Sequence, residues 1–423
     1  MKRILCLLLA AMMLFGGAFA EGEMPENVKN AYQTTGDYIE SLGAPQVGSV
    51  GGEWLVLGLA RSGFATNEEY YQNVVKYVQE HINEKGQLSP RVSTDNSRLI
   101  LALTAAGYDV TDVGGHNLLR GLSDLNYIKK QGINGPIFAL LALDSHDYDV
   151  PKNDDSTKQI TREALIDYIL GAQLENGGWS FDENADVDLT AMALQALAPY
   201  QSDERVAVAT QKAVELLSSM QEEDGGFSSW GSNNSNTAAQ VVIALSALNI
   251  DAFKDERFVK NGTSALEAVC RFYTGKGSFG YADAQTADQM STEQCYLALA
   301  AYFRMLDGKT ALYNMTDVEL KGHVHGFLPA YDEDGHWTAC SCGETTERKP
   351  HTYGEWTVTK PATGKEAGER ERTCTVCGYV QHEEITSSPK TGDGMDLALW
   401  LTLGGASMLA LAVLVLLKKR QKA

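Results

Sequence analysis

The stretch QLENGGWSF, Gln173–Phe181, indicates the fold because it recurs further along the chain. The sequence QEEDGGFSS, at Gln221–Ser229, aligns with it position by position and without a gap. A weaker copy, GKGSFGY, stands at 275–281. Each copy places a glycine turn and an aromatic residue between apolar runs. Self-similarity at such a period is typical of proteins built from stacked supersecondary units.

The apolar runs on either side of these turns have the spacing of helices and not of strands. Loops rich in Gly, Asn, Asp and Ser separate them. A single helical hairpin cannot bury its apolar face alone, so neighbouring hairpins must stack, and about six units of roughly 45–50 residues fit. The period leaves open whether the stack is an open solenoid or a closed ring. The predicted helices cover residues 67–82, 95–106, 161–173, 189–200, 204–220, 237–248, 264–273 and 292–305.

The two clearest copies resemble the QW repeat of the terpenoid cyclase and protein prenyltransferase superfamily. The resemblance implies an α/α toroid, in which an inner and an outer ring of helices surround a central cavity. Glycines at these positions permit a tight turn, and the aromatic side chain fills the junction between hairpins. Because these roles are structural, the repeat predicts the fold and not an activity. The residues concerned are Gln173, Gly177, Trp179, Gln221, Gly225 and Phe227.

Two aspartates, Asp186 and Asp188, stand directly before the helix predicted at 189–200. They resemble the first part of the DxDD motif of squalene–hopene cyclases, which implies that Asp188 is a general acid able to protonate an alkene. Leu189 replaces the last aspartate of that motif. The simpler interpretation, which we prefer, is that Asp188 caps the helix. In the second copy of the repeat the pair becomes Asn234 and Asn236, and asparagine caps a helix but is no acid.

A third interpretation of the same loop is a calcium site. Asp182, Asn184, Asp186 and Asp188 alternate like the first half of a calcium-binding loop. The remaining positions depart from the pattern, because Val187 stands where glycine is needed, and Ala193 where a bidentate glutamate is needed.

The composition changes after residue 315, where cysteines and histidines gather. EWTVTK and RERTCTVCGYV alternate like strands, so we expect a small β-module over 316–386. A module of this size needs a covalent or metal crosslink. Four thiolates are available for a structural zinc, with two histidines as substitutes, and disulfides are the alternative. The candidate ligands are Cys340, Cys342, Cys374, Cys377, His336 and His351.

The two ends of the chain predict export and attachment. Residues 1–20 have the basic start, apolar run and small-x-small end of a signal peptide. SPKTG, then the apolar span 397–417 and a basic tail, resembles the sorting signal of Gram-positive wall-anchored proteins, although serine replaces the usual leucine. The resemblance implies that a sortase cuts between Thr391 and Gly392 and joins the threonine to peptidoglycan.

The expected organisation is therefore a signal peptide (1–20), a mainly α toroid (21–315), a β-module (316–386) and a sorting signal with a membrane span (387–423). The formal charge of −20 argues against nucleic-acid binding. We expect a wall-anchored surface protein whose toroid binds an extracellular ligand, which is a hydrophobic small molecule, a glycan or a protein. The alternatives are a cyclase-like enzyme that uses Asp188 and a polysaccharide-processing enzyme with two facing carboxylates.

Overall fold

The structure, a computed structural model, forms two compact units. The helical unit comprises the described residues up to Leu328 together with Cys340–Glu344, and the β-module comprises Pro329–Ala339 and the described residues from Thr345 onward. The residues described are 24–65, 67–229, 231–363 and 365–386.

The helical unit is built from twelve α-helices within its described residues, with two short hairpins between them. The hairpins are β1 (Ser228–Ser229) with β2 (Ser232–Asn233), and β3 (Val259–Lys260) with β4 (Thr263–Ser264). The helices are α2 (Glu26–Ser41), α3 (Trp54–Arg61), α4 (Glu68–His81), α5 (Thr94–Ala105), α6 (Leu125–Ile128), α7 (Asn134–Asp144), α8 (Arg162–Gly171), α9 (Val187–Leu197), α10 (Glu204–Met220), α11 (Ser235–Ala247), α12 (Ala265–Cys270) and α13 (Gln289–Leu306).

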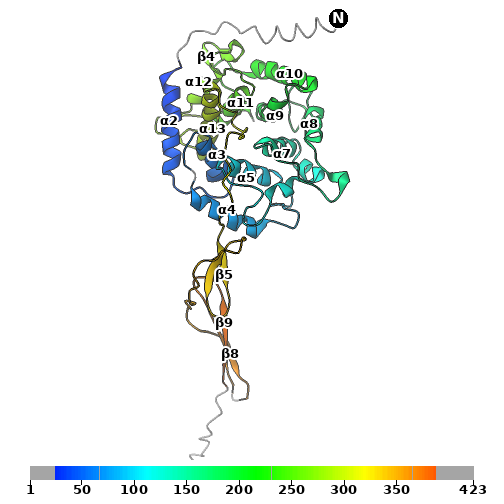
Figure 1. Cartoon of the computed structure of the whole chain (residues 1–423). Coiled ribbons are helices and arrows are strands. Elements are labelled where there is room, and N and C mark those ends of the chain that lie inside the picture. Colours follow the sequence, from blue (N-terminus) through cyan, green and yellow to red (C-terminus); the bar gives the residue numbers. More distant parts are fainter. Residues whose placement is uncertain (1–23, 66, 230, 364, 387–423) are drawn as a thin grey trace, which may run out of the picture. The chain divides into compact units, whose positions relative to one another are not determined.

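These helices form two concentric rings (Figure 1). In the inner ring, α3, α5, α7, α9, α11 and α13 each pack against the next, and α13 packs against α3. Helices α2, α8, α10 and α12 pack on the outside of this ring. One large hydrophobic cluster connects the rings. The closed inner ring confirms the predicted α/α toroid.

The side chains of the first repeat hold neighbouring hairpins together. The Gln173 amide donates hydrogen bonds to the carbonyl oxygens of Gly177 at 2.8 Å and of Ala209, on α10, at 2.9 Å. Trp179 is buried, and its indole N–H donates to the carbonyl oxygen of Ile169 at 2.7 Å. The repeat thus joins the end of α8, the turn and the next outer helix, as its resemblance to the QW repeat implied.

The second repeat makes the same contacts. The Gln221 amide donates to the carbonyl oxygens of Gly225 at 2.9 Å and Phe258 at 3.0 Å, and Phe227 is buried. Gly177 and Gly225 have φ of +95° and +82°, a conformation that glycine adopts without the steric cost other residues meet.

The predicted helices are all present, with ends displaced by a few residues. The predicted ranges leave out four helices of the described residues, α2, α3, α6 and α7. Most residues of α7 are buried, because the inner ring is covered on nearly all sides. A helix that is apolar all round lacks the amphipathic period on which such a prediction depends.

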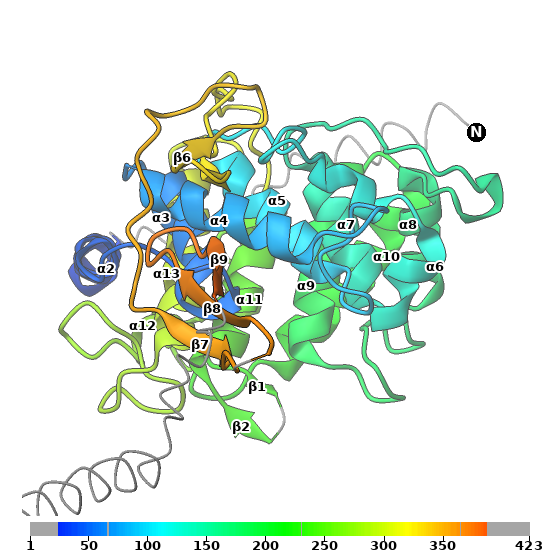
Figure 2. The same ribbon diagram turned by 90° about the horizontal axis from the view of Figure 1, so that it is seen from below.

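The β-module contains two small sheets, which confirms the predicted β character of this region. Strand β5 (Leu328–Tyr331) pairs with β6 (His336–Ala339). Strands β7 (Thr357–Lys360), β8 (Gly368–Thr373) and β9 (Val380–Ile385) form an antiparallel sheet (Figure 2).

The helical unit continues past the expected boundary after residue 315, because residues 307–321 pack across the inner ring, as described below. No helix in the described part of the chain is both long and apolar enough to span a membrane. The predicted signal peptide (1–20), cleavage site (Thr391–Gly392) and membrane span (397–417) lie outside the described residues.

Candidate functional site

The loop before α9 shows that Asp186, and not Asp188, caps this helix. The Asp186 carboxylate accepts the N–H of Leu189 at 2.9 Å through Oδ1 and the hydroxyl of Ser229 at 2.8 Å through Oδ2. Asn234 caps α11 in the same way, as its matching place in the second repeat requires. The prediction that Asp188 is the cap is therefore wrong, because the capping residue is the earlier aspartate of the pair.

Asp188 lies in the first turn of α9 with its side chain partly buried. Its Oδ1 atom is buried and has no hydrogen-bond partner among the described residues. Burial, and secondarily the charge of Asp186, raise the pKa of Asp188 to about 6. The nearby hydroxyls of Ser229 and Thr237 oppose this rise in the pKa of Asp188. Neither is hydrogen-bonded to Asp188, because the Ser229 hydroxyl donates to Asp186 and the Thr237 hydroxyl has no partner in the described structure. Asp188 is thus a carboxyl that gains a proton easily.

The calcium interpretation is not supported by the positions of the same aspartates. Asp182 accepts the backbone N–H of Asn184 at 2.8 Å, and Asp186 faces the end of its helix. Within the described residues, two groups of His, Cys, Asp and Glu side chains bring their ligand atoms within 4.8 Å of one another, and neither includes Asp182, Asp186 or Asp188.

A second acidic position, which the sequence patterns did not reveal, lies on α13. Glu293 is buried, and its Oε1 accepts the N–H of Gly51 at 2.8 Å while Oε2 is unpartnered in the described structure. Burial raises the pKa of Glu293 to about 7. Nearby, buried Glu53 accepts a hydrogen bond from Arg98 at 2.8 Å. Glu53 and Glu293 both lie within apolar or helix-forming sequence, and neither belongs to a recognised motif.

A pocket of about 520 Å³ lies at the C-terminal ends of α7, α9 and α11. Its polar side is formed by Asp144, whose carboxylate accepts hydrogen bonds from Arg162 and from the Tyr200 hydroxyl, each at 2.7 Å. Burial raises the pKa of Asp144, and the bonds from Arg162 and Tyr200 oppose that effect. The apolar side chains in its wall include Leu141, Ala196, Ile243, Ala247, Leu312 and Tyr313.

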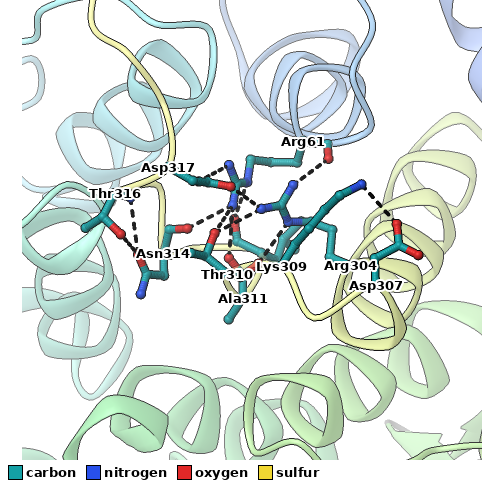
Figure 3. A network of polar contacts seen from close by, with 10 residues as sticks. Arg61, Arg304, Asp307, Lys309, Thr310, Ala311, Asn314, Thr316 and Asp317 are labelled. Atoms are coloured by element: carbon teal, nitrogen blue, oxygen red, sulfur yellow. Dashed lines mark hydrogen bonds and ion pairs between the residues drawn. The ribbon is translucent and has the colours of Figure 1, made fainter.

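Residues 307–321, which we call the strap, cover this end of the inner ring (Figure 3). Two buried guanidinium groups hold the strap in place. Arg61, at the end of α3, and Arg304, near the end of α13, both bind Asp317, at 2.8 and 2.6 Å, and both donate to the Thr310 hydroxyl at 2.9 Å. Burial alone would raise the pKa of Asp317, but the hydrogen bonds from Arg61 and Arg304 lower it to about 2.

The four cysteines of the C-terminal region fall into two groups, one within each compact unit, and not into the predicted four-thiolate set. Cys340 and Cys342 lie with two histidines that the sequence patterns missed, His323 and His325. The signal that could have identified them is the H-x-H spacing in GHVHG, which matches the C-x-C spacing of the cysteines.

The other two cysteines form a second group. Cys374 and Cys377 lie with His336 and His351, the two histidines that were predicted as substitute ligands. All cysteines among the described residues are free thiols.

Residues 118–325 match the model of the prenyltransferase alpha-alpha toroid domain. Drimenyl diphosphate synthase of Streptomyces showdoensis is 28% identical over 137 residues, which are 31% of this chain and 25% of that protein. This chain thus spans about a quarter of that relative. The ent-copalyl diphosphate synthase from Streptomyces platensis is 18% identical, with a TM-score of 0.40 over 60% of this chain and 50% of that one. Candida albicans protein geranylgeranyltransferase-I is 13% identical, with a TM-score of 0.44 over 69% of this chain and 99% of that one. The match over residues 118–325 shows that the chain contains a prenyltransferase-like α/α-toroid domain.

Proposed function

We propose that the toroid binds a neutral, largely apolar small molecule in the pocket beneath the strap. The observation that carries this proposal is the pocket itself, whose volume of about 520 Å³ lies within the range of small-molecule sites. Its wall combines apolar side chains of three consecutive inner helices with a polar side that includes Asp144, Asp147 and Arg162. Such a wall suits a hydrocarbon body that ends in a neutral hydrogen-bonding group.

The charges around the pocket select among apolar ligands. Asp144 and Asp147 both line it, against the single cation Arg162. The Arg162 guanidinium already binds Asp144 and donates to two backbone carbonyl oxygens. A diphosphate placed here would meet two carboxylates and no free cation among the described lining residues. The pocket therefore favours a neutral isoprenoid-like molecule over an isoprenoid diphosphate.

The proposal is tested by filling the pocket. Ala247, at the end of α11, faces the pocket, and Ala282 is an exposed alanine in a loop of the same unit. Calorimetric titration of the purified protein with the neutral alcohol farnesol and with its diphosphate should show binding of the alcohol alone. Ala247→Leu should weaken that binding at least about tenfold, because it removes pocket volume, and Ala282→Leu should leave it unchanged. Equal binding by wild type and Ala247→Leu, or preference for the diphosphate, would refute the proposal.

A second candidate function rests on Asp188. Its pKa of about 6 and its unpartnered Oδ1 in the described structure are properties of a carboxylic acid that is protonated part of the time near neutral pH. The relative that is 28% identical over 137 residues bears the name of a diphosphate synthase, and the DxD spacing resembles the acid motif of cyclases. In this mechanism Asp188 donates its proton to an alkene, the resulting carbocation closes a ring and loses a proton to water, and that proton returns to the Asp188 carboxylate. Leu189 leaves Asp188 without the last aspartate of that motif.

This second function predicts a product. Protein incubated with linear isoprenoid diphosphates should yield a cyclic isomer, detected by mass spectrometry after extraction. Asp188→Asn should abolish the product, and Asp186→Asn, which keeps a cap at α9, should retain it. If no cyclic product forms with wild type, the catalytic role of Asp188 is excluded for these substrates.

We also propose that sortase joins the mature chain to peptidoglycan through Thr391, outside a Gram-positive cell. The support is the sequence order SPKTG, apolar span 397–417 and basic tail. Wild type should be released by a muralytic enzyme with its C-terminal peptide ending at Thr391. Thr391→Ala should remain in the membrane fraction with its tail intact. Recovery of wild-type chains running to Ala423 only from detergent-solubilised membrane would show a plain membrane anchor instead.

A further inference from the structure

The group of side chains in the helical unit has the geometry of a metal site. His323 Nε2 lies 3.2 Å from Cys340 Sγ, and His325 Nδ1 lies 3.4 Å from Cys342 Sγ. All four ligand atoms lie within 4.8 Å of one another. Zinc bonds of about 2.3 Å to sulfur and about 2.0–2.1 Å to nitrogen place tetrahedral ligands roughly 3.3–3.8 Å apart. The four atoms therefore already surround a point where an ion fits after small adjustments.

The group in the β-module has the same composition. His351 Nδ1 lies 3.4 Å from Cys377 Sγ, and His336 Nδ1 lies 3.9 Å from Cys374 Sγ. Here too the four ligand atoms lie within 4.8 Å of one another. Two thiols and two imidazoles in each group make a complete tetrahedral set, with no position left open for water. Closed sets of this kind are structural sites and not catalytic ones.

Hydrogen bonds behind the imidazoles orient them toward the thiols in the helical unit. His323 Nδ1 binds the Asp112 carboxylate at 2.8 Å, which leaves Nε2 facing Cys340. His325 Nε2 lies 3.1 Å from the Glu344 carboxylate, which leaves Nδ1 facing Cys342. A zinc-binding histidine typically donates its other ring N–H, the one that does not face the metal, to a carboxylate.

The β-module shows the same arrangement with a backbone acceptor. His351 Nε2 donates to the carbonyl oxygen of Asp332 at 2.7 Å, so that Nδ1 faces Cys377. The module also has almost no apolar core, since Cys374 is its one buried hydrophobic side chain among the described residues. A small module without an apolar core requires a metal or a covalent crosslink.

We propose that the chain binds two structural zinc ions, each in its own Cys₂His₂ set. The ion in the helical unit joins residues 323–325 to residues 340–342, and the ion in the β-module joins 336 and 351 to the C-x-x-C turn at 374–377. Zinc is the metal that matches two thiolates and two imidazoles in a closed tetrahedral site. Each thiol loses its proton on binding, and no redox step is involved.

The test counts metal ions in the purified full chain by elemental mass spectrometry. Wild type should carry two zinc ions. Cys342→Ser should lose one of them and Cys377→Ser the other, and the double variant should carry none. His382→Ala is the matched control, because His382 lies on β9 with an exposed side chain and belongs to neither group. It should keep both ions.

A histidine variant separates this proposal from its rivals. His325→Ala should lose one zinc ion, whereas a single four-thiolate site would keep its ion in this variant. Cobalt substitution should give tetrahedral visible bands with two thiolates per ion. Helical circular dichroism, which reports the toroid, shows whether a variant that has lost an ion remains folded. Two results would overturn the proposal. The first is a wild type without metal whose mass is lower by four hydrogens, the loss expected from two disulfides. The second is a single ion bound by Cys340, Cys342, Cys374 and Cys377 together.

Discussion

Replacing Asp188 with asparagine should stabilise the protein at neutral pH. The Asp188 carboxylate is largely desolvated, lies near Asp186, and has one oxygen without a hydrogen-bond partner in the described structure. Asparagine has nearly the same shape and no charge, so the substitution removes the electrostatic cost without leaving a cavity. The helix cap is unaffected, because Asp186 provides it.

The magnitude follows from the pKa of Asp188, which burial raises from 3.8 to about 6. Each unit of pKa difference between the folded and unfolded states corresponds to about 1.4 kcal/mol. The ionised side chain therefore costs about 3 kcal/mol, and we expect about 2–3 kcal/mol after allowing for its partial exposure. Because the folded pKa is the higher one, the contribution of this group to stability is complete below pH 4 and is lost as the pH rises toward 6 and above.

The assay is urea unfolding of the helical unit, followed by circular dichroism from pH 4 to pH 8. Asp188→Asn should be more stable than wild type at pH 8, and the two should converge near pH 4. Asp186→Ala should behave oppositely and lose about 1–2 kcal/mol, because it removes the cap and the acceptor of the Ser229 hydroxyl. An Asp188→Asn variant that is less stable than wild type, or whose advantage does not change with pH, would refute the assignment of these two roles.

Three further outcomes are expected. Trp179→Ala should lower the free energy of unfolding by about 3–5 kcal/mol, whereas Phe181→Ala, whose side chain is 62% exposed, should change it by less than about 0.5 kcal/mol in the same urea titration. Glu293→Gln should stabilise the protein by about 3 kcal/mol at pH 8 and have no effect below pH 4.5, since burial raises the pKa of Glu293 from 4.5 to about 7; a pH-independent effect would contradict this. Asp317→Asn should cost about 3 kcal/mol by leaving the buried guanidinium groups of the strap underpaired, and hydrogen exchange over 307–321 should become faster.

The sequence determines the toroid because the repeat is a local device. Gln173 and Trp179 bind backbone atoms of their own hairpin or of the next outer helix, and Gly177 sets the turn between them. Such contacts recur at a fixed spacing, so that aligning the chain with itself reveals them without any knowledge of the fold. The strands of the β-module are visible for the same reason, since their alternation is a property of consecutive residues.

The tertiary structure alone decides how distant polar residues are paired. The sequence offers two aspartates for one cap, and a single hydrogen bond to Leu189 selects Asp186 and leaves Asp188 desolvated. The closure of the ring by α13 on α3, and the pocket under the strap, join segments that stand far apart along the chain. The division of the cysteines between two histidine pairs likewise depends on which segments meet. Periodicity records the neighbours of a residue along the chain, whereas the burial and pairing that set its chemistry depend on its neighbours in space.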